Sequence, residues 1–76
     1  MNSPVRIAVI GAGNRARKYV RHILSHPDDA TLTAAADPDI RRRERFAAET
    51  SLDASRLYAT DEEMLAERAG EIDAII

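Results

Sequence analysis

Short apolar runs alternate with amphipathic segments along the chain. The first apolar run, "VRIAVI" at residues 5–10, is rich in β-branched side chains and ends at Gly11. A nearly continuous apolar run of this length is typical of a strand covered on both faces, as in a parallel sheet. Arg6 interrupts the run, and we expect it to lie close to solvent at the start of the strand.

A helical pattern follows over residues 14–26 and ends before Pro27. Its apolar residues recur three and four positions apart, which predicts one buried stripe along the helix. The stripe consists of Ala16, Tyr19, Val20, Ile23 and Leu24. The cationic side chains of this segment fall outside the stripe.

The next two segments predict a second strand and a second helix. Residues 31–36, "TLTAAA", contain three alanines that favour a helix, but the segment is too short and lies between two helical patterns. We therefore expect a strand. Pro38 and Asp39 open a helix over residues 39–50, with Ile40, Phe46 and Ala47 facing inward and "RRRER" facing outward.

The last third of the chain predicts a short strand at residues 57–59, a helix and a final strand at 72–76. Thr60 and Glu63 have the spacing of a capping box, which predicts a helix start, and Gly70 ends this helix after Arg68. The alternation is typical of an α/β fold. We predict part of a Rossmann fold: a parallel sheet of strand order 3-2-1-4 with helices on both faces.

The chain stops inside an apolar run, "EIDAII". We therefore expect residues 1–76 to be the N-terminal portion of a dinucleotide-binding domain, truncated in the fourth strand, with the rest of this domain and a substrate domain absent. The sequence shows neither a secretory leader nor a membrane-spanning run, and a cytoplasmic protein is the default expectation.

Composition narrows the function classes. The 76 residues carry a formal net charge of −2 and no cysteine, which excludes disulfide scaffolds and thiolate metal sites. We expect no nucleic-acid partner, because the net charge is negative and no aromatic residues interleave with the basic run. That run, residues 41–45, is interpreted as a solvated helix face, although a 2′-phosphate is an alternative ligand for it.

The segment "GAGNRA", Gly11 to Ala16, matches the G-x-G-x-x-G/A motif between a strand and a helix. Gly11 permits a sharp turn, Gly13 lets a pyrophosphate approach the backbone, and Ala16 allows close helix–strand packing. The N–H groups of the turn and the helix dipole attract phosphates. The predicted cofactor site comprises Gly11, Ala12, Gly13, Asn14, Arg15, Ala16 and Asp37.

Three charged residues of this region have separate interpretations. Arg15 is a candidate phosphate contact, whereas we expect Arg17 and Lys18 to be solvated. Asp37 ends the second strand, 21 residues after Ala16, near the spacing of a ribose-binding acid. It is an alternative cap for the following helix, but we favour Asp39 as the cap. A carboxylate on the ribose repels a 2′-phosphate, so we expect NAD rather than NADP.

The remaining polar residues show no catalytic pattern. No nucleophile lies near a base in the sequence pattern, and we expect no catalytic residue and no metal ligand in these 76 residues. His22 and His26 are interpreted as surface residues. The glutamates of residues 62–67 are explained by a helix start and by solvation.

Five blocks in series, "IAVIGAGNRARKYVRHI", "AAADPD", "RFAAET", "LYATDEEMLAE" and "IDAII", resemble the N-terminal part of the Gfo/Idh/MocA oxidoreductases. The resemblance places the family's phosphate-binding loop on residues 11–16 and its ribose-binding acid on Asp37. Ala16 departs from a glycine common in relatives. Thr60 matches a position near the cofactor's edge. The family's catalytic lysine, in a Glu-Lys-Pro motif, corresponds to a position after residue 76.

The resemblance implies hydride transfer between NAD and a hydroxyl carbon of a sugar, cyclitol or related polyol. We also expect a homo-oligomer as the full-length protein, with no membrane partner. The family includes glycosidases that use a tightly held NAD, and this alternative stays open. A non-catalytic module that senses NAD(H) is a further alternative, whereas a binder of FAD or S-adenosylmethionine is disfavoured.

Overall fold

Four parallel strands form one sheet of order β3-β2-β1-β4 in the computed structural model, which describes residues 4–76 and, within these, all side chains except those of residues 14 and 15. The strands are β1 (Val5–Ile10), β2 (Ala30–Ala36), β3 (Leu57–Tyr58) and β4 (Ala74–Ile75). The predicted strand order 3-2-1-4 is confirmed, with the third and fourth strands shorter than expected.

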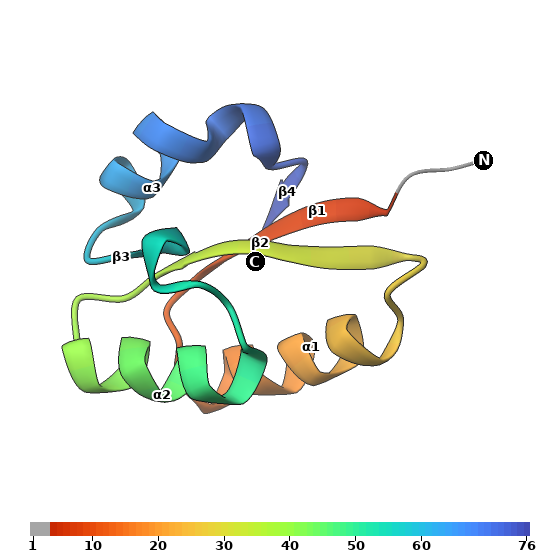
Figure 1. The fold of residues 1–76 in the computed structure, drawn as a ribbon, viewed down its shortest axis with the longest axis horizontal. Helices are drawn as coiled ribbons and strands as arrows, with labels where there is room; N and C mark the ends of the chain where they lie inside the picture. The colour runs from red at the N-terminus through yellow and green to blue at the C-terminus, as the bar shows by residue number, and fades with distance from the viewer. Residues whose placement is uncertain (1–3) are drawn as a thin grey trace.

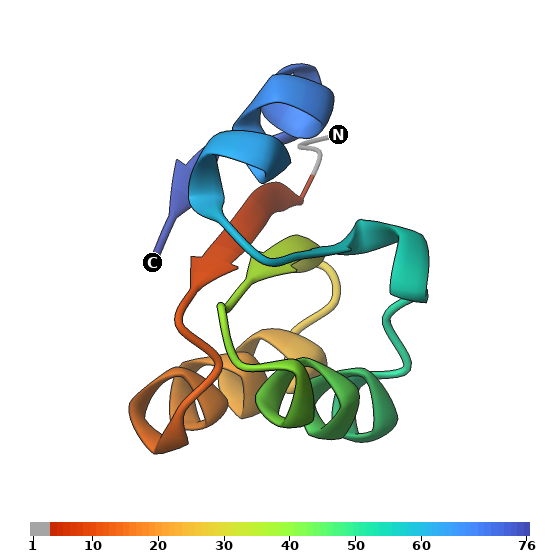
Figure 2. The same cartoon turned by 90° about the vertical axis from the view of Figure 1, so that its left-hand side faces the viewer.

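The helices cover both faces of this sheet, as predicted. Helices α1 (Asn14–Ser25) and α2 (Ile40–Thr50) lie side by side on one face, and α3 (Asp61–Arg68) lies on the other (Figures 1 and 2). Two short 3₁₀ turns, Ala54–Arg56 and Ala69–Glu71, lead into β3 and β4. Because each helix follows a parallel strand, α1 and α2 both begin at the carboxyl edge of the sheet.

The core has one half on each face of the sheet. Successive strand side chains point to opposite faces, so Val9 faces α1 and α2 while Ala8 faces α3, and both are fully buried. Alanines 34–36 of β2 divide in the same way. Two large side chains, Phe46 and Met64, fill the two halves. Small residues on the strands let the helices approach closely, which explains why an alanine-rich segment forms one of the two interior strands here.

Three apolar residues that we expected to face the core are about half exposed. Ile40 is 58% exposed, and Tyr19 and Leu24 are each 47% exposed. Ile40 opens α2 at the edge of the sheet, where β2 has already ended. Tyr19 and Leu24 flank the buried stripe of α1, whose centre is formed by Ala16, Val20 and Ile23. The predicted stripe is therefore wider than the buried one.

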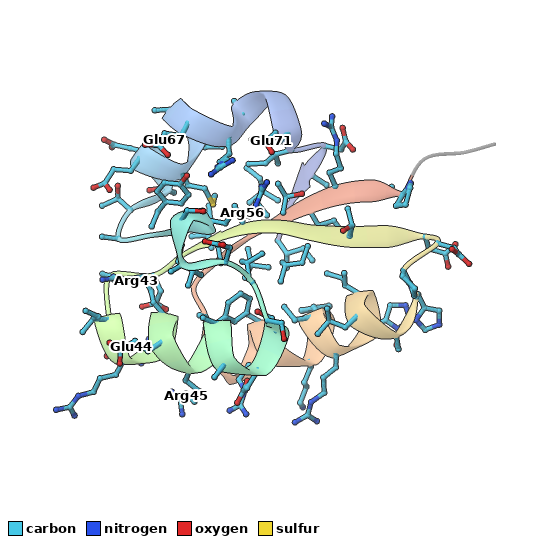
Figure 3. The ribbon with its side chains drawn as sticks, viewed as in Figure 1. Arg43, Glu44, Arg45, Arg56, Glu67 and Glu71 are labelled. Atoms are coloured by element: carbon cyan, nitrogen blue, oxygen red, sulfur yellow. The ribbon has the colours of Figure 1, made fainter. Side chains whose placement is uncertain are left out.

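A polar network fastens α3 to β3. The hydroxyl of Tyr58 donates to Glu67 Oε2 at 2.7 Å and accepts from Arg68 Nε at 3.0 Å. Arg68 and Arg56 both donate to the carboxylate of Glu71, at 3.0 and 3.2 Å. Arg56, Glu67 and Glu71 are labelled in Figure 3. Glu67, which we expected to be merely solvated, therefore has a structural partner.

The predicted N-caps of α2 and α3 are confirmed. The side chain of Thr60 accepts from Glu63 N, and the side chain of Asp39 accepts from Arg41 N and Arg42 N.

A bidentate ion pair joins β1 to the start of β4. Arg6 donates from Nε and Nη2 to the two carboxylate oxygens of Asp73 at 3.1 and 2.9 Å, and its backbone N–H donates to Asp73 Oδ2 at 2.9 Å. These side-chain and backbone hydrogen bonds lower the pKa of Asp73 from 3.8 to about 2. The carboxylate is therefore stabilised in its ionised form by the fold.

Asp73→Asn should remove an acid-sensitive part of the stability. Because the folded-state pKa of Asp73 lies below its unfolded value, this contribution is complete above pH 3.8 and is lost as the pH falls through about 2. We expect wild type to exceed the variant in urea midpoint at neutral pH, and the gap to narrow between pH 3.8 and 2. A gap that stays constant over this range would contradict the assignment. Asp28→Asn, at an exposed turn, is the matched control.

Candidate functional site: a glycine turn at the carboxyl edge of the sheet

The segment from Gly11 to Ala16 connects β1 to α1. Gly11 has φ +84°, a conformation that favours glycine, and its N–H donates to Ala36 O at 2.8 Å. Gly13 is the N-cap of α1 with φ −84°, and no side chain caps this helix. A Cβ built on either glycine meets no protein atom within 4 Å. The backbone of the turn is therefore open to a ligand, although only Gly11 needs glycine for its conformation.

The two alanines of the motif face the core. Ala12 is 3% exposed and Ala16 is 9% exposed, and both pack with Val9, Val20 and Phe46. Their small size allows the first turn of α1 to lie close against the sheet. The side chains of Asn14 and Arg15 lie outside the described part of the structure, so the expected phosphate contact of Arg15 stays a prediction.

Asp37 connects the glycine turn to the loop before α2. It is 2% exposed, and its Oδ2 accepts from Ala12 N while its Oδ1 accepts from Asp39 N, both at 2.8 Å. Asp39, and not Asp37, caps α2. Asp39 therefore caps the helix, as expected, and Asp37 lies beside the glycine turn; its contact with a ribose stays a prediction.

Two arginines of α2 compensate the charge of Asp37. Arg42 Nη1 lies 3.9 Å from Asp37 Oδ2, and Arg43 Nη1 donates to the backbone oxygen of Asp37 at 2.6 Å. Burial alone would raise the pKa of Asp37, but hydrogen bonds from the Asp39 and Ala12 amides and the charges of Arg42 and Arg43 outweigh it and lower this pKa below 3.8. Asp37 is therefore ionised at neutral pH.

Two adjoining hollows open on either side of the glycine turn. The larger, with a volume of about 580 Å³, is lined by Ile10, Gly11, Gly13, Ala16, Tyr19, Arg42 and Ile76. The smaller, of about 300 Å³, is lined by Ile10, Gly11, Ala36, Pro38, Ala59, Thr60 and Asp61. Both lie at the carboxyl edge, where the strand order reverses at β1. In open α/β sheets, this crevice is the place where ligands bind.

Three residues that line the larger hollow were not expected there from the sequence. Tyr19 was assigned to the packing stripe, Arg42 to a solvated face and Ile76 to a buried strand. The available signal was positional: Arg42 lies in the first turn of a helix that begins at the carboxyl edge, five residues after Asp37. Thr60, by contrast, was expected near the cofactor's edge and does line the smaller hollow.

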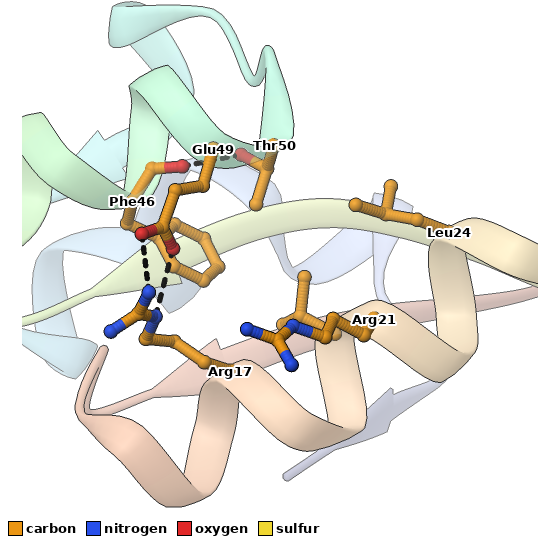
Figure 4. A pocket seen from close by; sticks show the side chains of 7 residues that line it. Arg17, Arg21, Leu24, Phe46, Glu49 and Thr50 are labelled. Carbon is orange, nitrogen blue, oxygen red and sulfur yellow. Dashed lines mark hydrogen bonds and ion pairs between the residues drawn. The ribbon is translucent and has the colours of Figure 1, made fainter.

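A third hollow, of about 220 Å³, lies between α1 and α2 away from the glycine turn (Figure 4). Arg17 Nε and Nη2 donate there to the two oxygens of Glu49 at 2.9 and 2.6 Å. The expectation that Arg17 is simply solvated is wrong, because this pair bridges the two helices. Lys18 is exposed, as expected.

The two histidines pack against each other at the surface, away from the glycine turn. His22 and His26 are exposed and stack on one another, with ring centroids 4.2 Å apart. Within residues 4–76, the described side chains form no group of three histidines, aspartates or glutamates that could hold a metal ion. No helix in this part of the chain is long and apolar enough to cross a membrane.

Comparison with solved structures supports the fold. The chain is 24% identical to the WlbA dehydrogenase of Bordetella pertussis, with a TM-score of 0.83 over 99% of this chain and 20% of that protein. It is 26% identical to WlbA of Chromobacterium violaceum, with a TM-score of 0.76 over 87% of this chain and 18% of that protein. Both were crystallised with NADH and UDP-GlcNAcA. The chain thus spans about one fifth of the length of these proteins.

Comparison with family models identifies the domain. Residues 5–76 match the model of the oxidoreductase family with an NAD-binding Rossmann fold, whereas no curated protein matches the chain significantly. This match includes all four strands and the glycine turn described above. It confirms the resemblance noted from the five sequence blocks and the assignment of NAD as the cofactor of the domain. The chain belongs to the Gfo/Idh/MocA oxidoreductase family, as its NAD-binding Rossmann domain.

Proposed function

We propose that the crevice beside Gly11 and Gly13 holds NAD(H) for an oxidoreductase that acts on a hydroxyl carbon of a sugar, cyclitol or related polyol. One observation carries the proposal: an open glycine turn at a helix start, tied through Ala12 to a buried ionised carboxylate. The NADH and UDP-sugar bound by the WlbA proteins support the same cofactor and the broad substrate class. When NAD is bound, its nicotinamide ring would accept the hydride from the substrate.

The residues of the turn fit a pyrophosphate. The first N–H groups of a helix have no intrahelical acceptor, and those of α1 begin at Gly13, whose missing side chain leaves the approach open. The positive end of the helix dipole lies at the same point. Binding there orients the cofactor across the end of β1, between the two hollows.

In this proposal, Asp37 orients the adenosine ribose. Each carboxylate oxygen has two lone-pair sites, and the amides of Ala12 and Asp39 use one on each oxygen. The remaining lone pairs can accept from ribose hydroxyls. Because Asp37 also holds the glycine turn, it couples the ribose position to the pyrophosphate position.

Titration of the full-length protein with NADH, followed by nicotinamide fluorescence, tests this proposal. We expect saturable binding in wild type, and an affinity about tenfold lower in Asp37→Asn, which loses the charge but keeps one acceptor oxygen. Asp28→Asn, at the opposite edge of the sheet, should bind like wild type. A folded wild-type protein that binds no NADH would refute the proposal. If NADH binds, a screen of sugars and polyols with NAD tests the substrate class.

A further inference from the structure

The two histidines of the chain lie one turn apart at the carboxyl end of α1. His22 is in the last turn of the helix and His26 is its C-cap, four positions later. Side chains at this spacing lie above one another on the same face of a helix. Both residues are exposed, and their rings stack with centroids 4.2 Å apart and planes inclined by 26°. The pair therefore presents two imidazole rings to solvent side by side.

The hydrogen bonds of His26 determine which of its ring nitrogens keeps a lone pair. Its Nδ1 lies 2.9 Å from the backbone oxygen of His22 and 3.0 Å from Ser25 Oγ. A carbonyl oxygen can only accept a hydrogen bond, so Nδ1 of the neutral ring carries the proton. The Ser25 hydroxyl donates to the same backbone oxygen at 2.9 Å, which leaves its own oxygen to accept. Nε2 of His26 then keeps its lone pair, and no described residue donates to it.

This arrangement is the one that metal-binding histidines use. A metal-bound imidazole usually donates its other N–H to a carboxylate, a backbone carbonyl or water, which fixes the tautomer and the orientation of the ring. Two histidines four positions apart on a helix can bind one Zn²⁺ from the same face. Nitrogen ligands of one Zn²⁺ are roughly 3–3.5 Å apart. Rings that stack at 4.2 Å need only a small tilt to reach this separation, since the χ2 angle of histidine is loosely restrained.

The charges around the pair favour a cation. The carboxyl end of α1 carries the negative end of the helix dipole. The turn that follows holds two exposed acids, Asp28 and Asp29, and the amide of Asp29 donates to His26 O at 3.0 Å. Arg21 precedes the pair, but it lines the hollow between α1 and α2. The described residues place no third histidine or carboxylate with the pair, so an ion bound there would complete its coordination with water.

We propose that His22 and His26 form a two-ligand site for a divalent transition-metal ion such as Zn²⁺. Imidazole suits Zn²⁺, Ni²⁺ and Cu²⁺, whereas Mg²⁺ prefers oxygen ligands. The site revises the expectation that these residues contain no metal ligand. It does not depend on the proposed function, because the length of α1, about 18 Å, separates it from the glycine turn (Figure 1). A bound ion joins the last turn of α1 to its C-cap and stabilises the folded state.

Calorimetric titration of the chelator-treated full-length protein with ZnCl₂ tests the site. We expect one equivalent of Zn²⁺ to bind at least about tenfold more weakly in His22→Gln and in His26→Gln than in wild type. Lys18→Gln, exposed on the same helix, should bind Zn²⁺ like wild type. The double variant Lys18→His with His22→Gln keeps two histidines but places them eight positions apart, so it should bind as weakly as His22→Gln.

Thermal unfolding of the same proteins gives a second readout. Zn²⁺ should raise the unfolding temperature of wild type more than that of either histidine variant, because the folded helix holds the two ligands together. Without metal, the variants should unfold like wild type, since both side chains are exposed. Mg²⁺ should shift none of them.

Three results would overturn the site. Equal Zn²⁺ affinity in wild type and both histidine variants would mean that neither ring binds the ion. A loss in only one of the two variants would contradict a shared ion. Binding as tight as in wild type by the pair placed eight positions apart would show that the helical spacing is irrelevant. The NADH titration of the same variants should match wild type, so a failure of the proposed function is seen separately.

Discussion

Gly13→Asp is expected to leave the domain folded while weakening NADH binding by at least about a hundredfold. Gly13 has an ordinary φ of −84°, and an added Cβ meets no protein atom within 4 Å. It is also the N-cap of α1, where aspartate is among the preferred residues. The variant therefore places a carboxylate on the helix N-terminus without disturbing the protein itself.

The loss of affinity follows from competition at that helix start. The carboxylate of the variant accepts the same N–H groups that the pyrophosphate needs, and it adds like-charge repulsion to the lost contacts. Fluorescence titration with NADH measures the affinity, and thermal unfolding of the same samples shows whether the domain is intact. Unchanged or higher thermal stability together with lost binding is the expected signature.

Gly13→Asn is the matched control for charge. Asparagine caps a helix as well as aspartate and is nearly the same size, so it keeps the steric part of the change and removes the repulsion. We expect it to weaken NADH by about tenfold. If Gly13→Asp bound NADH as wild type does, the pyrophosphate would not lie at this turn. Gly11 is a poorer test, because its φ of +84° makes any side chain there strain the turn itself.

Local features were predictable from the sequence because their causes lie within a few residues. The strand before Gly11 and the caps at Asp39 and Thr60 each depend on neighbours in the chain, and the structure has them as expected. The strand order also followed, since parallel strands joined by helices leave few arrangements. Ile40 was wrongly expected to be buried. It lies on the side of α2 that faces the sheet, but the sheet does not extend far enough to cover it.

The site at the glycine turn and the bridge between α1 and α2 both depend on contacts between distant segments. Asp37 reaches Ala12 across 25 positions, and Arg17 reaches Glu49 across 32, and neither pairing leaves a periodic signal. The spacing of Asp37 was recognisable, but its burial and its engagement by two amides were not. For the same reason the role of Arg42 in the crevice was hidden within a run of similar arginines.

Phe46→Ala should destabilise the domain by about 3–5 kcal/mol, toward the upper part of that range. Phe46 is 1% exposed and is the only phenylalanine of the chain. Its buried neighbours in the cluster are all alanine or valine, and three partly buried leucines, Leu32, Leu52 and Leu57, lie at the margin. The short alanine and valine side chains cannot move into the space that the ring leaves, so the cavity stays open. A domain of this size has a total stability of roughly 4–11 kcal/mol, so much of it is at risk.

Urea unfolding followed by circular dichroism measures this loss, with Phe46→Leu and Leu24→Ala beside it. Phe46→Leu fills most of the cavity and should cost about 1–2 kcal/mol, whereas Leu24→Ala, at a 47% exposed position, should cost less than about 1 kcal/mol. A loss of stability at Phe46→Ala no larger than that at Leu24→Ala would mean that the Phe46 ring does not anchor α2 to the core. Because Ala12 belongs to the same core cluster and donates to Asp37, we expect the opened core to loosen the glycine turn as well. Saturating NADH should then raise the urea midpoint of Phe46→Ala, since a ligand that binds only the folded state shifts the equilibrium toward it.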